Sequence, residues 1–164
     1  MSANVSIGPN PAEVQARLLD SSVKANGALT ISAVSQQSID AIVVAAAVAL
    51  AGGGAAGVGI SGAGVSADNR IQSLVTASIV GDGVNTATDG ITAGSVSLRA
   101  DDASVINAIA GAAAVAASFG GTGGISVSIG VSLAYNEVSN QVTAYVLNAD
   151  EGVFTVGGGD VDIS

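Results

Sequence analysis

The chain repeats itself without a gap. When residues 39–79 are laid over residues 106–146, 17 of 41 positions are identical. The longest shared run is Ala45–Ala49, which returns as Ala112–Ala116. Repeats of this kind stack on one another, because a single repeat cannot bury its apolar face alone. The constant offset therefore predicts a stacked architecture, and it favours a scaffolding role over catalysis.

The repeat divides the whole chain. The opening of a full repeat is seen at 27–33 and again at 94–100, and the segment 14–20 echoes 142–148. No linker or charge run separates these segments, so the sequence predicts one continuous domain over residues 1–164. We expect it to contain a partial repeat at 5–26, a first repeat at 27–93, a second at 94–158 and the start of a third at 159–164.

The composition excludes several kinds of chemistry. Nearly half of the residues are hydrophobic (49%), yet there are only two Phe, two Tyr and no Trp, and both His and Cys are missing. Ser–His and Cys–His nucleophiles and the usual zinc sites are thereby excluded. We expect no cofactor and no enzymatic activity. An enzyme that uses only carboxylates is the weakest alternative, and it would need two acids held in one pocket.

The excess of acidic residues limits the kinds of partner that the chain can bind. Thirteen acidic and four basic residues give a formal net charge of −9. This argues against nucleic acid and against anionic membrane surfaces, since both require clusters of Lys and Arg. Residues 41–67 and 103–136 carry no charge and are long enough to span a bilayer. Their Gly clusters, alternating Ser residues and lack of aromatic or basic anchors predict that membrane insertion does not occur.

The start of the chain and its composition suggest a compartment. Met1–Asn4 has neither the basic nor the apolar region of a signal peptide. The sequence is therefore expected to be a segment of a longer protein. An acidic chain that lacks cysteine and is rich in Gly, Ser and Thr is typical of secretion by a bacterium, so we predict an extracellular or cell-surface location.

The clearest structural signal is strict alternation over residues 125–135. Large apolar residues occupy every odd position, and Ser, Gly or Ala every even one, which predicts a β-strand. Residues 141–147 form another β-rich run. The Ala-rich stretches 39–51 and 104–119 admit a helical alternative, because Ala is a good helix former. We favour strands there, since one parity is almost entirely Ala while the other is mixed in size.

The sequence therefore predicts an all-β fold, a β-solenoid of stacked sheets built from repeats of about 67 residues. The alternative is an α/β repeat with short helices at 39–51 and 104–119. Gly-rich turns at 52–57 and 120–124 are expected to close β-hairpins. A face of Ala opposite a face of Ser, Gly and Ala would let two sheets approach more closely than the usual ~10 Å. We expect an Ala/Val interior with acidic turns outside.

Asn69 and Asn136 end the alternating strand at equivalent places in the two repeats. One interpretation is a ladder in which side-chain amides stack from coil to coil and donate hydrogen bonds to one another. The other is an ordinary turn Asn. Both assign these residues a structural role.

The acidic residues are concentrated in expected turns, at Asp82, Asp89, Asp101–Asp102, Asp150–Glu151, Asp160 and Asp162. Within Gly157–Asp162, Asp160 and Asp162 are weak calcium candidates, because calcium prefers several oxygen ligands from one loop. The segment lacks the nonapeptide repetition of specific calcium turns. Solvated acidic turns are therefore the preferred interpretation, and no metal site is predicted.

The order of features resembles that of a known class of repeats. An Ile/Ala/Val run, a Gly-rich turn, an alternating strand ending in Asn and then Val-Thr-Ala-x-Val occur at 39–79 and 105–147, after the openings at 27–33 and 94–100. This pattern is similar to the repeats of large secreted bacterial proteins, the filamentous-haemagglutinin-like and leukotoxin-type filamentous adhesins. The resemblance implies an extended β-solenoid at the cell surface, with no catalytic residue to transfer.

We therefore expect a structural or adhesive segment of an extracellular bacterial surface protein or fibre. Its partner is expected to be another copy of itself, joined end to end, or the adjacent repeats of a longer parent chain. A host or matrix ligand is a further possible partner of unknown identity. The alternative function is a calcium- or carbohydrate-binding repeat module, which would require the acidic turns to converge.

Overall fold

The computed structural model describes residues 10–81, 90–149 and 152–164. Over these residues the protein is all-β and contains no helix, and therefore no helix that could cross a membrane. The two Ala-rich stretches are the strands β4 (Ser38–Gly53) and β8 (Val105–Gly120). The preferred strand prediction is thus confirmed and the helical alternative is wrong. Alternation of side chains between two faces outweighed the helix propensity of Ala.

The chain forms two compact units. The core unit comprises the described residues within Met1–Gln37, Ile71–Ser104 and Val138–Ser164, and the arch unit comprises Ser38–Arg70 and Val105–Glu137. Two long strands, β5 (Gly57–Val80) and β9 (Gly124–Leu147), contribute to both.

The core unit contains three parallel sheets of three strands each. Their orders are β1-β5-β9, β2-β6-β10 and β3-β7-β11. The short strands of this unit are β1 (Ala12–Leu19), β2 (Val23–Lys24), β3 (Ala28–Ser35), β6 (Ile91–Ala93), β7 (Ser95–Asp102), β10 (Val153–Thr155) and β11 (Val161–Ile163). Each sheet therefore takes one strand from each of three successive stretches of the chain, as expected for stacked coils.

β3 pairs with β7, and β4 with β8, in parallel and in the register that the sequence offset predicts. Ala28 lies opposite Ser95 and Ser38 lies opposite Val105, and both pairs have the offset of the sequence repeat. One corner of the core unit shows the same regularity. The backbone N–H of Asp20 donates to the carbonyl of Val80 at 2.8 Å. The backbone N–H of Gly81 donates to the carbonyl of Leu147 at 3.0 Å. Successive coils thus repeat the same hydrogen bond.

Large apolar side chains fill the core unit. The middle strands β5, β6 and β7 have a neighbour on both sides, so their inward side chains are almost completely shielded. Val75 and Leu98 are fully buried, and Ile91 is 2% exposed. The predicted Ala/Val interior is therefore correct for this unit, with Ile and Leu added to it.

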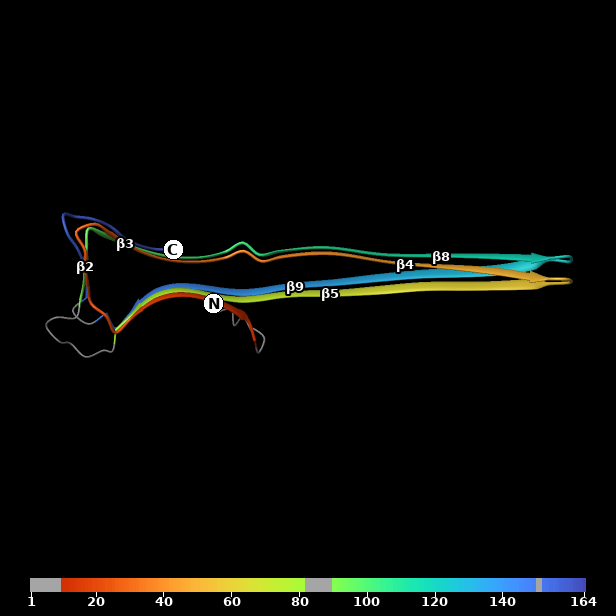
Figure 1. Ribbon diagram of the computed structural model, residues 1–164, viewed down its shortest axis with the longest axis horizontal. Coiled ribbons are helices and arrows are strands. Elements are labelled where there is room, and N and C mark those ends of the chain that lie inside the picture. The colour runs from red at the N-terminus through yellow and green to blue at the C-terminus, as the bar shows by residue number, and fades with distance from the viewer. Residues whose placement is uncertain (1–9, 82–89, 150–151) are drawn as a thin grey trace, which may run out of the picture. The chain divides into compact units, whose positions relative to one another are not determined.

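The arch unit has a different construction. β4 pairs with β8, while β5 pairs with β9, so the strand before each Gly-rich turn and the strand after it belong to different sheets (Figure 1). The predicted β-hairpins are therefore wrong, and each turn closes a β-arch whose two arms face each other through their side chains. The reason is that parallel pairing between coils already engages the backbone groups of both arms.

Small residues lie between the two sheets of the arch unit. The hydroxyl of Ser61 reaches across and donates to the carbonyl of Ala47 at 3.0 Å. A Cβ added at Gly57 or Gly59 would lie 2.7 or 2.8 Å from a carbonyl oxygen of the opposite sheet. Real Cβ atoms do not approach backbone so closely, so glycine is required at these positions. This is the close approach that the small-residue faces predict.

Most large apolar residues of the arch unit point away from the opposite sheet and into solvent. Ile42 and Leu50 are each 75% exposed. The other exposed members of this outward set are Val44, Val48, Val58, Ile60, Val105, Ile109, Val115, Phe119, Ile125, Val127, Ile129, Val131, Leu133 and Tyr135. The expectation of an Ala/Val interior is therefore wrong for most of the arch unit, where Ala is inside and most Val is outside. Near the turns the sheets are too close together to hold branched side chains between them.

Candidate functional site

The residues that carry specific polar contacts in the arch unit meet from coil to coil. Asn69 on β5 donates from Nδ2 to Oδ1 of Asn136 on β9 at 3.0 Å. The structure thus brings the two predicted residues together in the geometry of an amide ladder. Their structural role stays a prediction, and the hydrogen bond gives it a defined physical form.

A second contact joins β4 and β8. Nδ2 of Asn107 donates to Oδ1 of Asp40 at 2.9 Å, and the hydroxyl of Ser38 donates to the other carboxylate oxygen of Asp40 at 3.2 Å. Asp40 and Asn107 lie directly opposite each other in the strand register.

The third contact is an ion pair. Nε of Arg70 lies 3.1 Å from Oε2 of Glu137, and these two residues are again equivalent in the two repeats. Neighbouring strands lie ~4.7–4.9 Å apart, so identical charges at these places would repel one another from coil to coil. The replacement of Asp40 by Asn107, and of Arg70 by Glu137, instead gives each coil a complementary neighbour.

Sequence comparison alone registers these positions as differences between the repeats. Their role is revealed by the chemistry of the pairs at the repeat offset. Asp40 is an acceptor opposite the donor Asn107, and Arg70 is a cation paired with the anion Glu137. Together the three contacts hold adjacent coils in register, because a slip by one residue would move every partner to the other face of its strand.

A further polar cluster, which sequence reasoning missed, lies in the core unit around Asp102. Its carboxylate accepts hydrogen bonds from the hydroxyl of Ser73 at 2.7 Å, from the backbone N–H of Ser104 at 3.1 Å and from Nδ2 of Asn140. Asp102 lies opposite Ser35 in the strand register. The acidic pair Asp101–Asp102 was expected in a solvated turn, but both residues end strand β7 and Asp102 anchors this cluster.

Two opposing effects act on the pKa of Asp102. Burial raises the pKa, while hydrogen bonds from Ser73 and Ser104, together with the nearby hydroxyl of Ser35, lower it, and the net result is a pKa below the usual value. The ionised form is therefore the one that the folded protein stabilises. The cluster holds a single carboxylate surrounded by neutral donors.

The two calcium candidates lie at and within a short strand. Asp160 directly precedes β11 and Asp162 lies inside it, and Asp162 is exposed. Over residues 10–81, 90–149 and 152–164, no three acidic side chains come together in a way that could hold a metal ion. Other acidic residues named in the expected turns, Asp82, Asp89, Asp150 and Glu151, lie outside the described residues.

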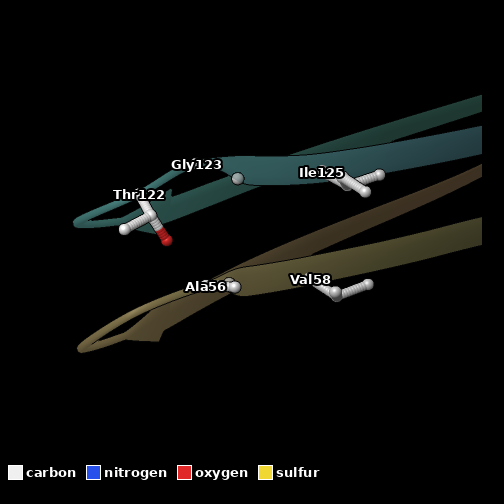
Figure 2. Close-up of a pocket in the computed structure, with 7 residues that line it drawn as sticks. Ala56, Val58, Thr122, Gly123 and Ile125 are labelled. Carbon is white, nitrogen blue, oxygen red and sulfur yellow. The ribbon is translucent and has the colours of Figure 1, made fainter.

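A shallow recess of about 280 Å³ lies at the turns of the arch unit. Figure 2 shows Val58 and Ile125 at matching places on two neighbouring strands, with Ala56 and Gly123 at the two turns. The hydroxyl of Thr122 donates to the carbonyl of Ala55, its equivalent in the first repeat. The lining is apolar and backbone-rich and holds no titratable side chain.

Comparisons with known proteins give no match to a family model, to a curated protein or to a solved structure.

Proposed function

We propose that this chain is a structural segment of an extracellular bacterial surface protein or fibre, related to the repeats of filamentous adhesins. It is a β-solenoid in which each repeat makes one wide coil, and equivalent residues of successive coils in the arch unit are offset by 67 positions. Its activity is mechanical: coils add along one axis through backbone ladders, and the chain associates end to end with further copies or with adjacent repeats of a longer parent.

The observation that carries this proposal is the parallel register between the long strands of the arch unit. Sixteen consecutive residue pairs join β4 to β8 at one constant offset. Side-chain contacts at Asn69, Asp40 and Arg70 follow the same offset. In the described part of the chain, the sheet β4-β8 has an open edge on each side. Open parallel edges of this length are templates for further strands.

Two features support an adhesive or fibrous role over catalysis. The polar contacts connect one coil to the next, and none of those described converges on a pocket that could hold a substrate. The outward rows of the arch unit also expose large apolar side chains, and exposed apolar surface of this kind is typical of sites that contact other macromolecules.

The proposal is tested by electron microscopy and fibre diffraction of the purified protein over a range of concentrations. We expect filaments that lengthen with concentration and give an axial reflection near ~4.7 Å. A variant with Ala144→Pro places proline on the open edge strand β9, where it cannot donate a backbone hydrogen bond. It should keep its β-type circular dichroism while filaments shorten or vanish. Monodisperse particles of the unchanged protein at high concentration would refute end-to-end association.

A further inference from the structure

The chain contains, within itself, an example of the contact that a second copy could make. In the core unit, the strands β1, β2 and β3 pair in parallel with the middle strands β5, β6 and β7. The strands β9, β10 and β11 lie on the opposite side of the same middle strands. Among the described residues, the outer edge of β1–β3 and the outer edge of β9–β11 are therefore the two edges of this stack without a paired strand.

The β9–β11 end presents nearly the same inward side chains as the middle strands do. Val75 and Ala77 of β5 correspond to Val142 and Ala144 of β9 at the repeat offset. The short strands agree in the same way. Ile91 lies opposite Val153, Val96 opposite Val161 and Leu98 opposite Ile163.

We infer that a second copy of the chain binds head to tail, with its β1–β3 edge on the β9–β11 edge of the first. Within one chain, Ala16 lies opposite Ala77, and Ala77 is equivalent to Ala144. The contact between copies therefore places Ala16 of one copy opposite Ala144 of the other. Val14 then meets Val142, and Leu18 meets Val146, so the apolar rows continue across the junction. The inference rests on the end-to-end association proposed above, and it defines the polarity and register of that association.

The corner of the core unit continues the same ladder. Asp20 and Asn148 both adopt positive φ, at 42° and 48°, and they follow β1 and β9 at equivalent places. Asp20 already donates its backbone N–H to Val80, and Gly81 donates to Leu147. In the head-to-tail contact, the backbone N–H of Asn148 in one copy donates the next equivalent hydrogen bond, to the carbonyl of Leu19 in the other copy.

The outward residues of the two edges are also complementary. Arg17 lies opposite Ser78 within the chain, and Lys24 lies opposite Thr92. At the junction these cations meet the residues equivalent to Ser78 and Thr92, which are Tyr145 and Phe154. A cation over an aromatic ring is favourable. A head-to-head contact would instead place the two β1–β3 edges together, with Arg17 and Lys24 of both copies in one interface.

Because the chain has no cysteine, single-cysteine variants report the junction directly. Ala16→Cys and Ala144→Cys proteins are mixed in equal amounts, allowed to assemble and oxidised. Residues opposite each other on adjacent strands lie within the Cα distance that a disulfide can bridge, about 4.4–6.8 Å. We expect disulfide-linked dimers in the mixture at several times the yield found with either variant alone.

The matched control pairs Ala16→Cys with Val146→Cys, which moves the second thiol two residues along the same face of β9. That displacement of roughly 6.6 Å along the strand takes the Cα atoms beyond disulfide range. Its yield should fall to the level of the single variants. Strong crosslinking of Ala16→Cys with itself would show a head-to-head junction and overturn the inference, and equal yields in every mixture would overturn the register.

Analytical ultracentrifugation of the same samples under reducing conditions separates the two proposals. If all of the variants and the unchanged protein remain monomeric, end-to-end association itself fails. If they associate but the disulfide between the Ala16→Cys and Ala144→Cys proteins does not form preferentially, the association stands and the head-to-tail junction described here is wrong.

Discussion

The core unit and the arch unit use the same parallel ladder and treat large apolar side chains in opposite ways. In the core unit, Leu98 is fully buried among three sheets, whereas Leu50 in the arch unit is 75% exposed. The comparison shows that a ladder of coils can be held by backbone pairing and close contact of small residues, without a core of large side chains. Burial of large apolar side chains stabilises the core unit. Backbone pairing and contacts between equivalent residues of successive coils maintain the arch unit.

The largest expected effect comes from the same truncation made in each unit. Leu98→Ala removes a fully buried side chain and should lower the free energy of unfolding by about 2–5 kcal/mol. Leu50→Ala removes an exposed one and should change it by no more than about 0.5 kcal/mol. Chemical denaturation followed by circular dichroism measures both. Equal destabilisation would mean that the outward face of the arch unit is buried in solution.

A smaller effect distinguishes the two faces of the arch unit. A Cβ at Gly130 would lie 2.9 Å from the carbonyl oxygen of Ala112, so Gly130→Ala forces the sheets apart and should cost about 1–3 kcal/mol. A Cβ at Gly111 meets nothing within 4 Å. Gly111→Ala should therefore be neutral or stabilise the protein by up to about 1 kcal/mol. Thermal unfolding of the two variants side by side tests this, and a reversed order would contradict the assignment of the faces.

Asp102 provides a pH-dependent test of the core unit. Because hydrogen bonds lower its pKa in the folded state, the stabilisation is complete above the unfolded pKa, about 3.9. It is lost as the pH falls through the lower, folded value. Unfolding measured at neutral pH and at strongly acidic pH should show a greater loss for the unchanged protein than for Asp102→Asn.

Ser73→Ala serves as the partner variant in this test, since its hydroxyl donates to Asp102 at 2.7 Å. It should reduce the acid-induced loss in the same direction, and the two changes combined should not be additive. An acid-induced loss that stays the same in all of these proteins would show that Asp102 is not the group responsible.

The smallest effect on stability is expected for Val48→Thr combined with Val115→Thr. Both side chains are exposed and lie opposite each other in the strand register. The free energy of unfolding should change by less than about 0.5 kcal/mol, while the fluorescence of a dye that binds apolar surface should decrease. Unchanged dye binding together with a large loss of stability would indicate that these rows are covered.

Much of the fold follows from the sequence, because one offset defines the pairing of the long strands. The offset places Ala41 beside Ala108, and the alternation along 125–135 identifies a strand without reference to its partner. The arch geometry is harder to predict from the sequence. A Gly-rich turn shows that the chain reverses, but it does not show whether the two arms pair through their backbones or face each other through their side chains.

The orientation of the faces could not be predicted for a similar reason. Alternation separates Val58 and Ile60 from Gly57 and Gly59, but it does not state which set is inside. The usual preference for burying large residues fails here, because the two sheets of the arch unit are close enough to exclude them. Asp102 was missed because the sequence gives its neighbours along the chain, whereas Ser73 and Asn140 approach it from another sheet.

In the arch unit, the residues between the two sheets and the residues on the outer surface vary to different extents from repeat to repeat. Several inward positions along β5 and β9 hold the same residue in both repeats, among them Gly57 and Gly124, Ser61 and Ser128, and Ala67 and Ala134. Outward positions along the same strands differ freely, as in Gly64 and Val131 or Asp68 and Tyr135. Along β5 and β9, each repeat therefore keeps a narrow interior while its outward residues vary. Such a protein can change what it presents to its surroundings without altering the spacing of its frame.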